Sequence, residues 1–504
     1  MPKFIEIMDT TLRDGEQTQG VSFNGDEKLA IAMALLSEAK VDRIEIASAK
    51  VSEGEFESVK KICNWADKNG FLEKVELLSF VDFNSSVDWA KKANCRAINL
   101  LTKGSEKHCR IQLGKKPEEH FEDIKKTIEY AKKNDFIVNA YLEDWSNGMK
   151  DSRKYVFDLV KVLVDLKVDR ILLPDTLGIL SPQETFDFVK EVVEKFPSQW
   201  FDFHAHNDYG LATANTLAAV KAGAKGVHVT VNGLGERTGN APLDEVVAVI
   251  NDITDFKTRV VESKLSSLGK MVEGFSGKRI AENKPITGAN VFTQTAGIHA
   301  DGDLKGKLYE NRLLPERFGR KREYALGKLS GKSSLEMNLQ KMGVNLSKEQ
   351  KALVLKKIVE LGDKKEKVTA EDLPFIVADV LETPGSKKIE IKNFTCTSTI
   401  GKNPKADLEL KAGGKVFNET ATGNGGYDAF MKALKKICQK IGLKLPELVD
   451  YELRIPPGGK TDAIVEATIT WQKNGSTFKT IGVDSDQLVA AIKSTEKMLN
   501  LVAK

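Results

Sequence analysis

The sequence predicts an α/β protein: a (β/α)8 TIM barrel, then a mostly helical linker region, then an α+β domain with an internal duplication. Eight short apolar runs rich in β-branched residues alternate with amphipathic stretches over residues 4–252. This is the pattern of parallel strands that are each followed by a covering helix. This alternation of apolar runs and amphipathic stretches ends after residue 255. Strand-like alternation of apolar and polar residues returns after residue 385, in two similar copies. Eight such units over about 250 residues favour a closed barrel over an open doubly wound sheet.

The expected barrel strands are apolar along nearly their whole length. They are Phe4–Met8, Arg43–Ala47, Val75–Val81, Ala97–Leu101, Ile137–Leu142, Arg170–Leu173, Trp200–Phe203 and Gly226–Val231. The intervening stretches have helical periodicity; in the first, Asn24 and Glu27 have the spacing of a capping box before a helix at Asp26–Lys40. No G-x-G-x-x-G follows any of these strands, which weakens the alternative of a dinucleotide-binding fold.

The expected domains are a barrel at 1–255, helical linker subdomains at 256–385 and a C-terminal domain at 386–504. Linker helices are expected at Lys264–Phe275, Ser347–Leu361 and Ala370–Glu382, and Thr383–Ser386 has the Pro-Gly composition of a boundary. The C-terminal domain is expected to contain a βββα unit twice. The first copy is Lys388–Phe394, Ala406–Lys411, Lys415–Thr420 and a helix Tyr427–Ile441; the second is Val449–Ile455, Asp462–Trp471, Ser476–Val483 and a helix from Asp486 to about Val502.

Composition excludes several classes of protein. The 504 residues are 41% hydrophobic and 29% charged, which excludes wholesale disorder. A formal net charge of +4 over this length does not indicate a nucleic-acid-binding surface. No stretch reaches the roughly 18 uninterrupted apolar residues of a membrane span. A charge interrupts the N-terminus before any signal-like apolar run forms. Five widely spaced cysteines without a C-x-x-C motif predict free thiols in a reducing cytoplasm.

Polar clusters follow several of the expected strands, at the end where a (β/α)8 barrel carries its chemistry. The first strand runs into Asp9–Glu16, the seventh into His204–Asp208 and the eighth into Asn232–Asn240. Two of the chain's six histidines, His204 and His206, occupy alternate positions of one strand, so both rings point the same way.

These clusters predict a metal site. The imidazoles of His204 and His206, the carboxylate of Asp14 and the amide oxygen of Asn240 suit a divalent Zn, Mn or Co ion. The competing interpretation of an H-x-H pair is an ordinary hydrogen-bonded polar pair. The position beside Asp14 and Asn240, at matching ends of neighbouring strands, favours the metal.

Three further charged residues stand at expected strand ends. Arg13 is either a surface ion pair with Asp14 or, as we prefer at a barrel mouth, a charge that polarises a carbonyl or stabilises an enolate. Glu143 is a candidate base or hydrogen-bond partner, with a solvated acid as the alternative. Glu45 is expected to pair with Arg13.

Together, these motifs resemble those of the DRE-TIM metallolyase superfamily, and within it the isopropylmalate, citramalate and homocitrate synthases. The resemblance rests on Asp9–Gln17, His204–Asp208 and Gly233–Asn240 in this order. Gly423–Ala429 and Gly458–Ala463 extend it, because they are similar to the family's C-terminal regulatory domain.

The resemblance implies a Claisen-type condensation of acetyl-CoA with a 2-oxo acid. Asp14, His204, His206 and Asn240 would hold the divalent metal, and the metal with Thr176 would hold the oxo acid. Arg13 would polarise the ketone while Glu45 orients Arg13. Glu143, directly or through water, would help to form the enolate of acetyl-CoA, and hydrolysis of the resulting thioester would release CoA.

The resemblance also implies a homodimer in which His299, Asp301 and, as a weaker candidate, Tyr309 cover the partner's active site. An ordinary polar turn is the alternative for these residues. The basic stretch Lys305–Lys332 is either a site for the phosphates of CoA or a solvated linker. Two positions depart from the family pattern: Ala205, where the family commonly has Gly and a methyl is expected to crowd the metal, and Ala490–Ser494 near the regulatory terminus.

The oxo acid is expected to place its side chain against Leu78, Leu101 and Tyr141, at the ends of the third, fourth and fifth strands. None is cationic, so a second carboxylate would be buried without a partner, which disfavours 2-oxoglutarate and homocitrate synthesis. The bulk of these side chains favours pyruvate, and these residues resemble the (R)-citramalate synthases. Isopropylmalate synthase, which uses 3-methyl-2-oxobutanoate, remains a close alternative, because one or two methylenes change the free energy of selectivity by only about 1–3 kcal/mol.

Two other classes of protein remain as alternatives. In amidohydrolases an H-x-H motif follows the first strand, whereas here it follows the seventh. A non-catalytic sensor of an amino acid would use residues 388–504, but it would not need the charged and metal-ligating residues of the barrel. For the synthase, the resemblance implies feedback inhibition through this C-terminal domain, by Ile if citramalate is the product and by Leu if isopropylmalate is.

Overall fold

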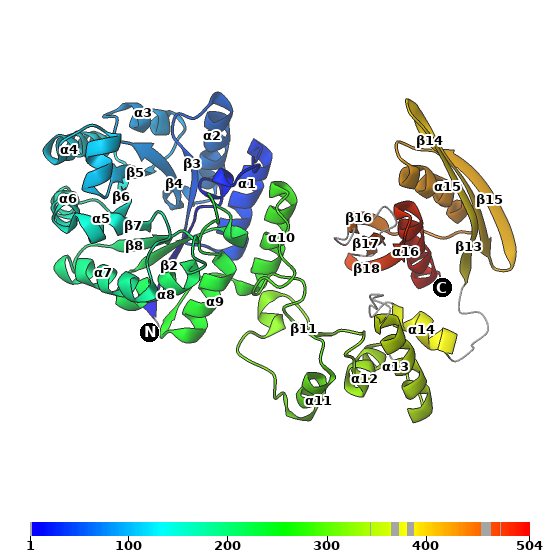
Figure 1. Cartoon of the computed structure of the whole chain (residues 1–504). Coiled ribbons are helices and arrows are strands. Elements are labelled where there is room, and N and C mark those ends of the chain that lie inside the picture. Colours follow the sequence, from blue (N-terminus) through cyan, green and yellow to red (C-terminus); the bar gives the residue numbers. More distant parts are fainter. Residues whose placement is uncertain are drawn as a thin grey trace. The chain divides into compact units, whose positions relative to one another are not determined.

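The structure is a computed structural model that describes residues 3–342, 344–363, 372–380, 388–454, 465–473 and 475–503. The chain folds into two compact units (Figure 1). The first comprises Met1–Phe292 and Asn311–Lys321, and the second comprises Thr293–Glu310 and Arg322–Lys504. Among the described residues, no helix combines the length and the apolar character that a bilayer crossing requires.

The first unit is built on a closed barrel of parallel strands, which confirms the predicted fold (Figure 1). Pairing of β2 with β9, in the register Asp9↔Val229, closes the cylinder. The barrel strands are β2 (Glu6–Asp9), β3 (Arg43–Ser48), β4 (Val75–Phe80), β5 (Ala97–Lys103), β6 (Ile137–Glu143), β7 (Arg170–Asp175), β8 (Phe201–Ala205) and β9 (Gly226–Val229).

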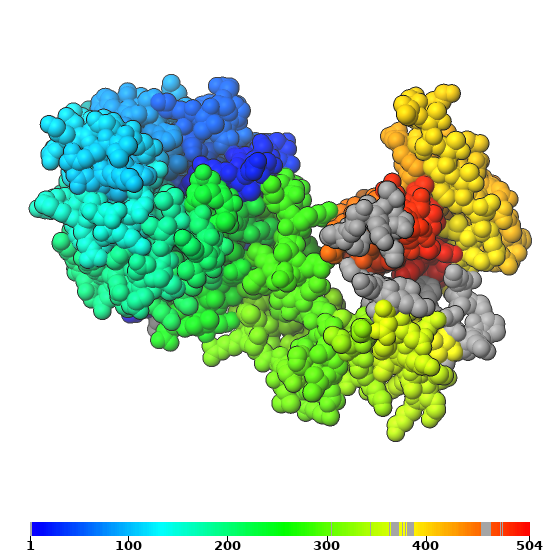
Figure 2. All heavy atoms as spheres, in the orientation of Figure 1, coloured from blue at the N-terminus to red at the C-terminus, as the bar shows by residue number. Residues whose placement is uncertain are grey.

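Helices cover the outside of the cylinder, so that the space-filling view shows helix and loop side chains from blue to green over this unit (Figure 2). They are α1 (Gly25–Met33), α2 (Glu53–Lys68), α3 (Ser85–Lys92), α4 (Pro117–Lys133), α5 (Trp145–Asp151), α6 (Arg153–Asp165), α7 (Pro182–Lys195), α8 (Ala212–Ala222) and α9 (Leu243–Ile253). The predicted capping box is present at the start of α1, where Asn24 accepts from the Glu27 amide at 3.0 Å and Glu27 accepts from the Asn24 amide at 2.9 Å.

Two expected elements are divided in the structure. The helix expected at Asp26–Lys40 is α1 followed by a π-helical stretch, Ala34–Ala39, which ends at Lys40 in the left-handed region (φ 59°). The first expected strand is also split, because Phe4 lies in β1 (Lys3–Phe4), which pairs with β10 (Phe256–Lys257) outside the barrel. The barrel strand itself begins at Glu6.

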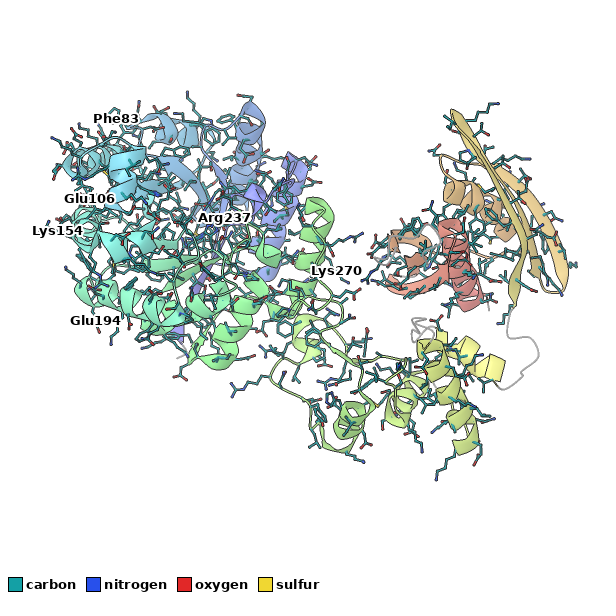
Figure 3. The ribbon with its side chains drawn as sticks, viewed as in Figure 1. Phe83, Glu106, Lys154, Glu194, Arg237 and Lys270 are labelled. Carbon is teal, nitrogen blue, oxygen red and sulfur yellow. The ribbon has the colours of Figure 1, made fainter. Side chains whose placement is uncertain are left out.

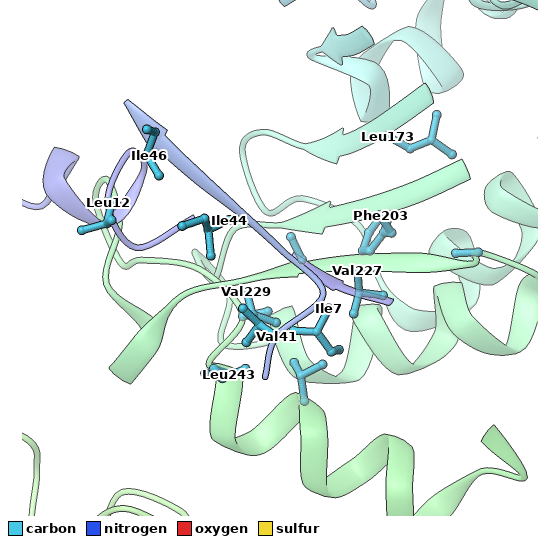
Figure 4. Packing of buried hydrophobic residues seen from close by; sticks show 14 of the residues in the cluster. Ile7, Leu12, Val41, Ile44, Ile46, Leu173, Phe203, Val227, Val229 and Leu243 are labelled. Atoms are coloured by element: carbon cyan, nitrogen blue, oxygen red, sulfur yellow. The ribbon is translucent and has the colours of Figure 1, made fainter. Parts of the chain in front are cut away.

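Alternation along each strand separates an apolar outer layer from a polar interior. Outward side chains such as Ile7, Ile44, Phe203 and Val227 are fully buried against the helices (Figure 4). The inward positions at the lower levels of the barrel carry charge instead. There Arg43 is 4% exposed and pairs with Glu76 at 2.7 Å, with Glu6 at 3.3 Å and with Asp202.

The linker contributes short elements to both units. α10 (Leu265–Ser276) belongs to the barrel unit and matches the helix expected at Lys264–Phe275. The second unit contains β11 (Thr293–Gln294), α11 (Gly297–Gly306), β12 (Glu323–Tyr324), α12 (Lys332–Lys341), α13 (Lys348–Asp363) and α14 (Leu373–Val380). α13 and α14 correspond to the other two expected linker helices, whereas α11 and α12 were not expected. The ends of the helix expected at Ala370–Glu382 and the boundary expected at Thr383–Ser386 lie outside the described residues.

The C-terminal part of the second unit contains the βββα unit twice, as predicted, and each sheet is antiparallel (Figure 1). The first copy is β13 (Ile389–Thr399), β14 (Lys402–Ala412), β15 (Lys415–Thr422) and α15 (Gly426–Lys440); the second is β16 (Glu447–Arg454), β17 (Val465–Lys473), β18 (Ser476–Asp484) and α16 (Gln487–Val502). Both copies share one hydrophobic cluster that includes Phe430 and Trp471. Gly458–Ala463, the end of the strand expected at Val449–Ile455 and the start of the strand expected at Asp462–Trp471 lie outside the described residues.

Candidate metal centre and active site

Asp14 is held at the mouth of the barrel by a tight turn that follows β2. The Asp14 amide donates to the Thr10 carbonyl at 2.8 Å, and the Thr11 amide donates to Asp9 Oδ1 at 2.9 Å. His204 lies near the end of β8 and His206 just beyond it, and an isolated antiparallel bridge joins His206 to Asn240. The structure therefore brings together side chains that are up to 226 residues apart in the chain, as the carboxyl ends of barrel strands do.

Three of the four predicted metal ligands have their ligand atoms within 4.8 Å of one another. Asp14 Oδ2 lies 3.3 Å from His204 Nε2 and 3.9 Å from His206 Nε2, and all three side chains are buried. Two donor atoms that are each about 2.1 Å from one ion lie between about 3 and 4.2 Å apart. These spacings therefore fit a single ion shared by Asp14, His204 and His206.

Asn240, the fourth predicted ligand, has its amide nitrogen engaged and its amide oxygen free. Its Nδ2 donates to the Leu234 carbonyl at 3.0 Å, and Gly235 allows this close approach because a Cβ there would lie 2.2 Å from Nδ2. Asn240 Oδ1 and Asp14 Oδ1 are both buried without a hydrogen-bond partner among the described residues. Since buried polar atoms are normally satisfied, two such oxygens in one site fit the binding of a cation there.

The electrostatics keep this site ready for a cation at neutral pH. Burial lowers the pKa of His204 and lowers the pKa of His206 to about 4, so both imidazoles are neutral and have a free lone pair. Burial alone would raise the pKa of Asp14, but opposing interactions, led by the positive charge of Arg13, hold that pKa well below its usual value. A carboxylate and two neutral imidazoles are the protonation states that metal binding requires.

Arg13 is not a solvated surface charge, because its guanidinium is fixed from three sides. Nε donates to Glu45, one terminal nitrogen donates to Asp14 Oδ2 at 2.9 Å, and the other donates to the Tyr141 hydroxyl at 3.3 Å. The expected pairing of Glu45 with Arg13 is present in the structure. Glu45 is held in turn by Asn99 Nδ2 at 2.7 Å, a contact that was not expected from the sequence.

The three residues expected to line the pocket for the oxo acid form one small apolar cluster with a fourth. Leu78, Leu101 and Tyr141 come from the neighbouring strands β4, β5 and β6, and Leu172 on β7 joins them. Leu172 is fully buried and lies opposite Tyr141 in the strand register. Leu172 was not predicted from the sequence, although the alternation along β7 was a signal for it.

Thr176 and Glu143 lie at neighbouring strand ends. Thr176 Oγ1 accepts the amide of Asp144 at 2.9 Å, and Asp144 adopts a left-handed conformation (φ 67°). Because Oγ1 accepts there, the hydroxyl proton of Thr176 remains available to a substrate. Arg237 (labelled in Figure 3) donates to the Thr176 carbonyl at 2.8 Å and pairs with Asp208, which ties this strand end to the loop that follows β9.

Glu143 does not stand alone, because it forms an ion pair with Lys103. Lys103 is 7% exposed and ends β5. Its backbone amide donates to His120 Nε2 at 3.2 Å, and its carbonyl accepts from the Tyr155 hydroxyl at 2.9 Å. Lys103 is two residues beyond Leu101 and therefore points the same way. Lys103 was not predicted from the sequence, although that alternation was the signal for it.

His299, Asp301 and Tyr309 belong to the second unit, where the structure brings His299 and Tyr309 together. Their rings lie 4.2 Å apart between centroids. Asp301 accepts from Lys305 at 2.7 Å and from the Ser333 hydroxyl at 3.3 Å. The proposed role of these three residues at a barrel site remains a prediction.

The two departures from the family pattern both have a packing explanation. Ala205 follows His204 on β8, and its side chain packs in the outer apolar layer; the effect of this methyl on the metal stays a prediction. In α16, Ala490 and Ala491 are fully buried, and the Ser494 hydroxyl lies 2.8 Å from that of Thr480 on β18. Small residues at these positions let α16 pack closely on its sheet.

Comparison with protein families covers nearly the whole chain. Residues 4–272 match the HMGL-like family, residues 286–366 match the homocitrate synthase post-HMGL domain-like family, and residues 367–503 match the LeuA allosteric (dimerisation) domain. These matched regions do not test the boundaries expected at 255 and 385, which remain predictions.

Curated relatives match along almost their full length. An (R)-citramalate synthase of Methanocaldococcus jannaschii is 34% identical over 501 residues, which is 99% of each chain. A 2-isopropylmalate synthase of the same organism is 34% identical over 512 residues, covering 100% of this chain and 95% of the relative. A Methanopyrus kandleri protein provisionally named (R)-citramalate synthase is 37% identical over 469 residues, covering 93% of this chain and 90% of the relative.

Proposed function

The chain belongs to the HMGL-like family, and we propose that it is an enzyme that condenses acetyl-CoA and pyruvate to (R)-citramalate and CoA. The observation that carries this proposal is the convergence of Asp14, His204 and His206, with Arg13 hydrogen-bonded to Asp14, near a small apolar cluster around Tyr141. Relatives named (R)-citramalate synthase and 2-isopropylmalate synthase support the reaction class.

The residues of the site fit a divalent ion. Asp14, His204, His206 and the free oxygen of Asn240 would hold it, and the identity of the ion is Zn, Mn or Co on the donor set alone. When bound, such an ion supplies Lewis acidity and a template for an α-oxo acid.

Arg13 and Thr176 position the oxo acid. The guanidinium of Arg13 donates toward Glu45, Asp14 and Tyr141 and cannot rotate freely, so its positive charge is preorganised where the ketone oxygen becomes an alkoxide. The hydroxyl of Thr176 donates its proton to the substrate carboxylate, because its oxygen already accepts from the Asp144 amide.

Glu143 acts as the base toward acetyl-CoA, the second substrate. Directly or through water, its carboxylate takes a proton from the methyl group of acetyl-CoA, and the resulting enolate forms a C–C bond with the ketone carbon. Water then cleaves the thioester and releases CoA. Lys103 holds the Glu143 carboxylate in place through their ion pair.

The pocket favours pyruvate over larger acids. Leu78, Leu101, Tyr141 and Leu172 pack as one cluster and present no cation for a second carboxylate. The bulk of Tyr141 and of the three leucines packed with it supports a methyl group over an isopropyl group as the substrate side chain. We therefore expect the variant Tyr141→Ala to shift the preference toward 3-methyl-2-oxobutanoate.

Synthesis of 2-isopropylmalate from 3-methyl-2-oxobutanoate is the second candidate function, because a 2-isopropylmalate synthase matches with the same identity as the (R)-citramalate synthase of that organism. For either product, the LeuA allosteric (dimerisation) domain supports a homodimer with feedback control, by Ile for citramalate and by Leu for isopropylmalate. In that dimer, His299, Asp301 and Tyr309 complete the partner's site, and the basic stretch at 305–332 attracts CoA. The proposed location is the cytoplasm.

Release of free CoA thiol from acetyl-CoA tests the proposal. The assay compares pyruvate, 3-methyl-2-oxobutanoate and 2-oxoglutarate, each with and without EDTA. We expect rapid release with pyruvate, slower release with 3-methyl-2-oxobutanoate, and loss of both on chelation that added Mn²⁺ restores. If none of the three 2-oxo acids supports CoA release, the proposal is contradicted and the non-catalytic sensor is favoured. Release of CoA in the absence of any oxo acid would favour a hydrolase.

A further inference from the structure

A chain of buried polar groups continues below the site, from Arg13 through Tyr141 to His228 and Asp202. The Tyr141 hydroxyl lies 3.0 Å from His228 Nδ1, and His228 Nε2 lies 3.3 Å from Asp202 Oδ2. The side chains of His228 and Asp202 are 0% exposed, so bulk water does not compete for these contacts. His228 is on β9 and Tyr141 is on β6, so this chain of contacts crosses the barrel interior.

The hydrogen-bond partners of Asp202 and His228 determine which nitrogen of His228 carries the proton and which way the Tyr141 hydroxyl donates. Asp202 also pairs with Arg43 and accepts from Trp200 Nε1 at 2.8 Å, so it is a carboxylate that can only accept from His228. His228 Nε2 therefore carries the proton, and the neutral ring presents Nδ1 as an acceptor. The Tyr141 hydroxyl donates to Nδ1, and its oxygen faces the Arg13 terminal nitrogen at 3.3 Å. Both sides of the hydroxyl are thus occupied.

The ring of Tyr141 is also confined by its neighbours. It meets the rings of His228 and His204 edge-on, with centroids 5.5 and 6.0 Å away. It packs with Leu78 and Leu172 in the apolar cluster. Rotation of Tyr141 away from the pocket would break its hydrogen bond to His228 and leave a buried imidazole nitrogen unsatisfied, which is unfavourable.

We propose that His228 is a positioning residue that sets the size selectivity of the enzyme by fixing the Tyr141 ring as a rigid wall of the oxo-acid pocket. This rests on the proposed function. His228 does not touch the substrate; it acts through the Tyr141 hydroxyl. A Tyr141 ring that cannot rotate leaves no room for an additional methylene. Without the hydrogen bond to His228, the ring can rotate and make room for a larger acid.

The test measures kcat/KM for pyruvate relative to 2-oxobutanoate, which is longer by one methylene. The variants are His228→Phe, Tyr141→Phe and the double variant, with His228→Gln as the conservative exchange. His228→Phe keeps a ring of similar size and leaves Asp202 with Arg43 and Trp200 as partners. The side-chain amide of His228→Gln can accept from Tyr141 and donate to Asp202.

We expect each Phe variant to lower the pyruvate preference by about tenfold, within the range that one methylene provides. The double variant should show no further loss beyond Tyr141→Phe, because that change already removes the hydrogen bond to His228, together with the contact from Arg13. His228→Gln should retain most of the preference. Should His228→Phe fail to fold, Tyr141→Phe and His228→Gln still report on the same hydrogen bond.

A preference that stays unchanged in His228→Phe or Tyr141→Phe would overturn this inference, as would fully additive losses in the double variant. A wild-type enzyme that releases no CoA with either acid would instead overturn the proposed function, and this inference with it. A matched control is Ser79→Ala on β4, a buried hydroxyl outside this chain of contacts, which should leave the preference unchanged.

Discussion

Single residues at the barrel mouth show which contacts a sequence pattern can predict. Asp14, His204 and His206 could be anticipated because each follows or ends a recognisable strand within a distinctive motif. Lys103, Asn99 and Leu172 could not be assigned a role in the same way. Their partners are set by the relative register of neighbouring strands inside a closed barrel, which no local pattern specifies.

The ion pair between Lys103 and Glu143 leads to a first prediction. Lys103→Met removes the cationic partner of the Glu143 carboxylate at the barrel mouth. The position of this carboxylate and its interaction with acetyl-CoA therefore change. We expect kcat to fall by at least tenfold with a small change in the KM for pyruvate, and Lys103→Arg to restore much of kcat. Steady-state kinetics of CoA release measure both parameters.

A matched control for Lys103 is Lys126→Met on the outer helix α4, where Lys126 is 55% exposed and pairs with Glu122 at 3.9 Å. This variant should behave as wild type, because an exposed pair of this kind contributes little. A Lys103→Met enzyme with unchanged kcat would show that Glu143 does not depend on its partner.

The buried carboxylate of Asp9 leads to a prediction about pH. Burial raises the pKa of Asp9 from 3.8 to about 7, although hydrogen bonds from Thr11 oppose the shift. The folded state therefore holds a proton that the unfolded chain releases near its ordinary pKa, so ionisation of Asp9 lowers the free energy of unfolding progressively between about pH 4 and 7. Asp9→Asn removes that loss.

We expect the free energy of unfolding of Asp9→Asn, relative to wild type, to rise by a few kcal/mol between pH 4 and 8 and then to level off. Urea denaturation at several pH values measures this difference. Asp67→Asn, which removes one exposed carboxylate, serves as the control. A difference for Asp9→Asn that does not change with pH would mean that Asp9 titrates near its ordinary value in the folded protein.

At the scale of elements, the helices and strands that were predicted well are those with a continuous pattern of their own. The barrel strands have a buried apolar outer face, and the expected boundaries differ from the observed ones by a few residues at most. In contrast, β13 and β14 are longer than expected, at Ile389–Thr399 and Lys402–Ala412. Their exposed ends are rich in Thr and Lys and are held by cross-strand pairing such as Thr399↔Lys402, which leaves no apolar alternation to read.

Close packing of α16 on β18 depends on a glycine in the strand. A Cβ at Gly482 would lie 2.0 Å from the Ala490 carbonyl oxygen and 2.6 Å from the Ser494 amide. Gly482→Ala must therefore displace the helix, and we expect it to destabilise the C-terminal domain by about 1–3 kcal/mol. Thermal unfolding followed by circular dichroism measures the loss.

Gly425→Ala is the comparison for Gly482→Ala, because Gly425 lies in the same domain and has a φ of −149°, and a Cβ added there would meet no atom within 4 Å. It should change the transition temperature only slightly. Equal transition temperatures for the two variants would indicate that α16 does not pack on Gly482 as described.

At the scale of the whole molecule, separate hydrophobic clusters make separate functions possible. The C-terminal βββα pair has its own cluster around Phe430 and Trp471, while the linker helices α12, α13 and α14 pack around Leu335, Leu339 and Ile358. The duplication of the βββα unit was visible in the sequence because both copies repeat the same order of strands and helix.

Removal of residues 388–504 tests the division of labour between these parts. The truncation removes the C-terminal cluster entirely and leaves the linker cluster whole among the described residues. We expect the truncated enzyme to retain condensation and to lose inhibition by Ile, or by Leu if isopropylmalate is the product. Retained inhibition would place the effector site outside residues 388–504, and the full-length enzyme assayed in parallel provides the reference.

The central claim is that one divalent cation binds between Asp14, His204, His206 and Asn240 at the mouth of the barrel. Anomalous diffraction from crystals of the full chain grown with Mn²⁺ tests it most directly. We expect a single strong peak per chain within about 2.3 Å of a carboxylate oxygen, two imidazole nitrogens and the Asn240 oxygen. A map with no peak among these side chains, or with its peak at another site, would contradict the claim.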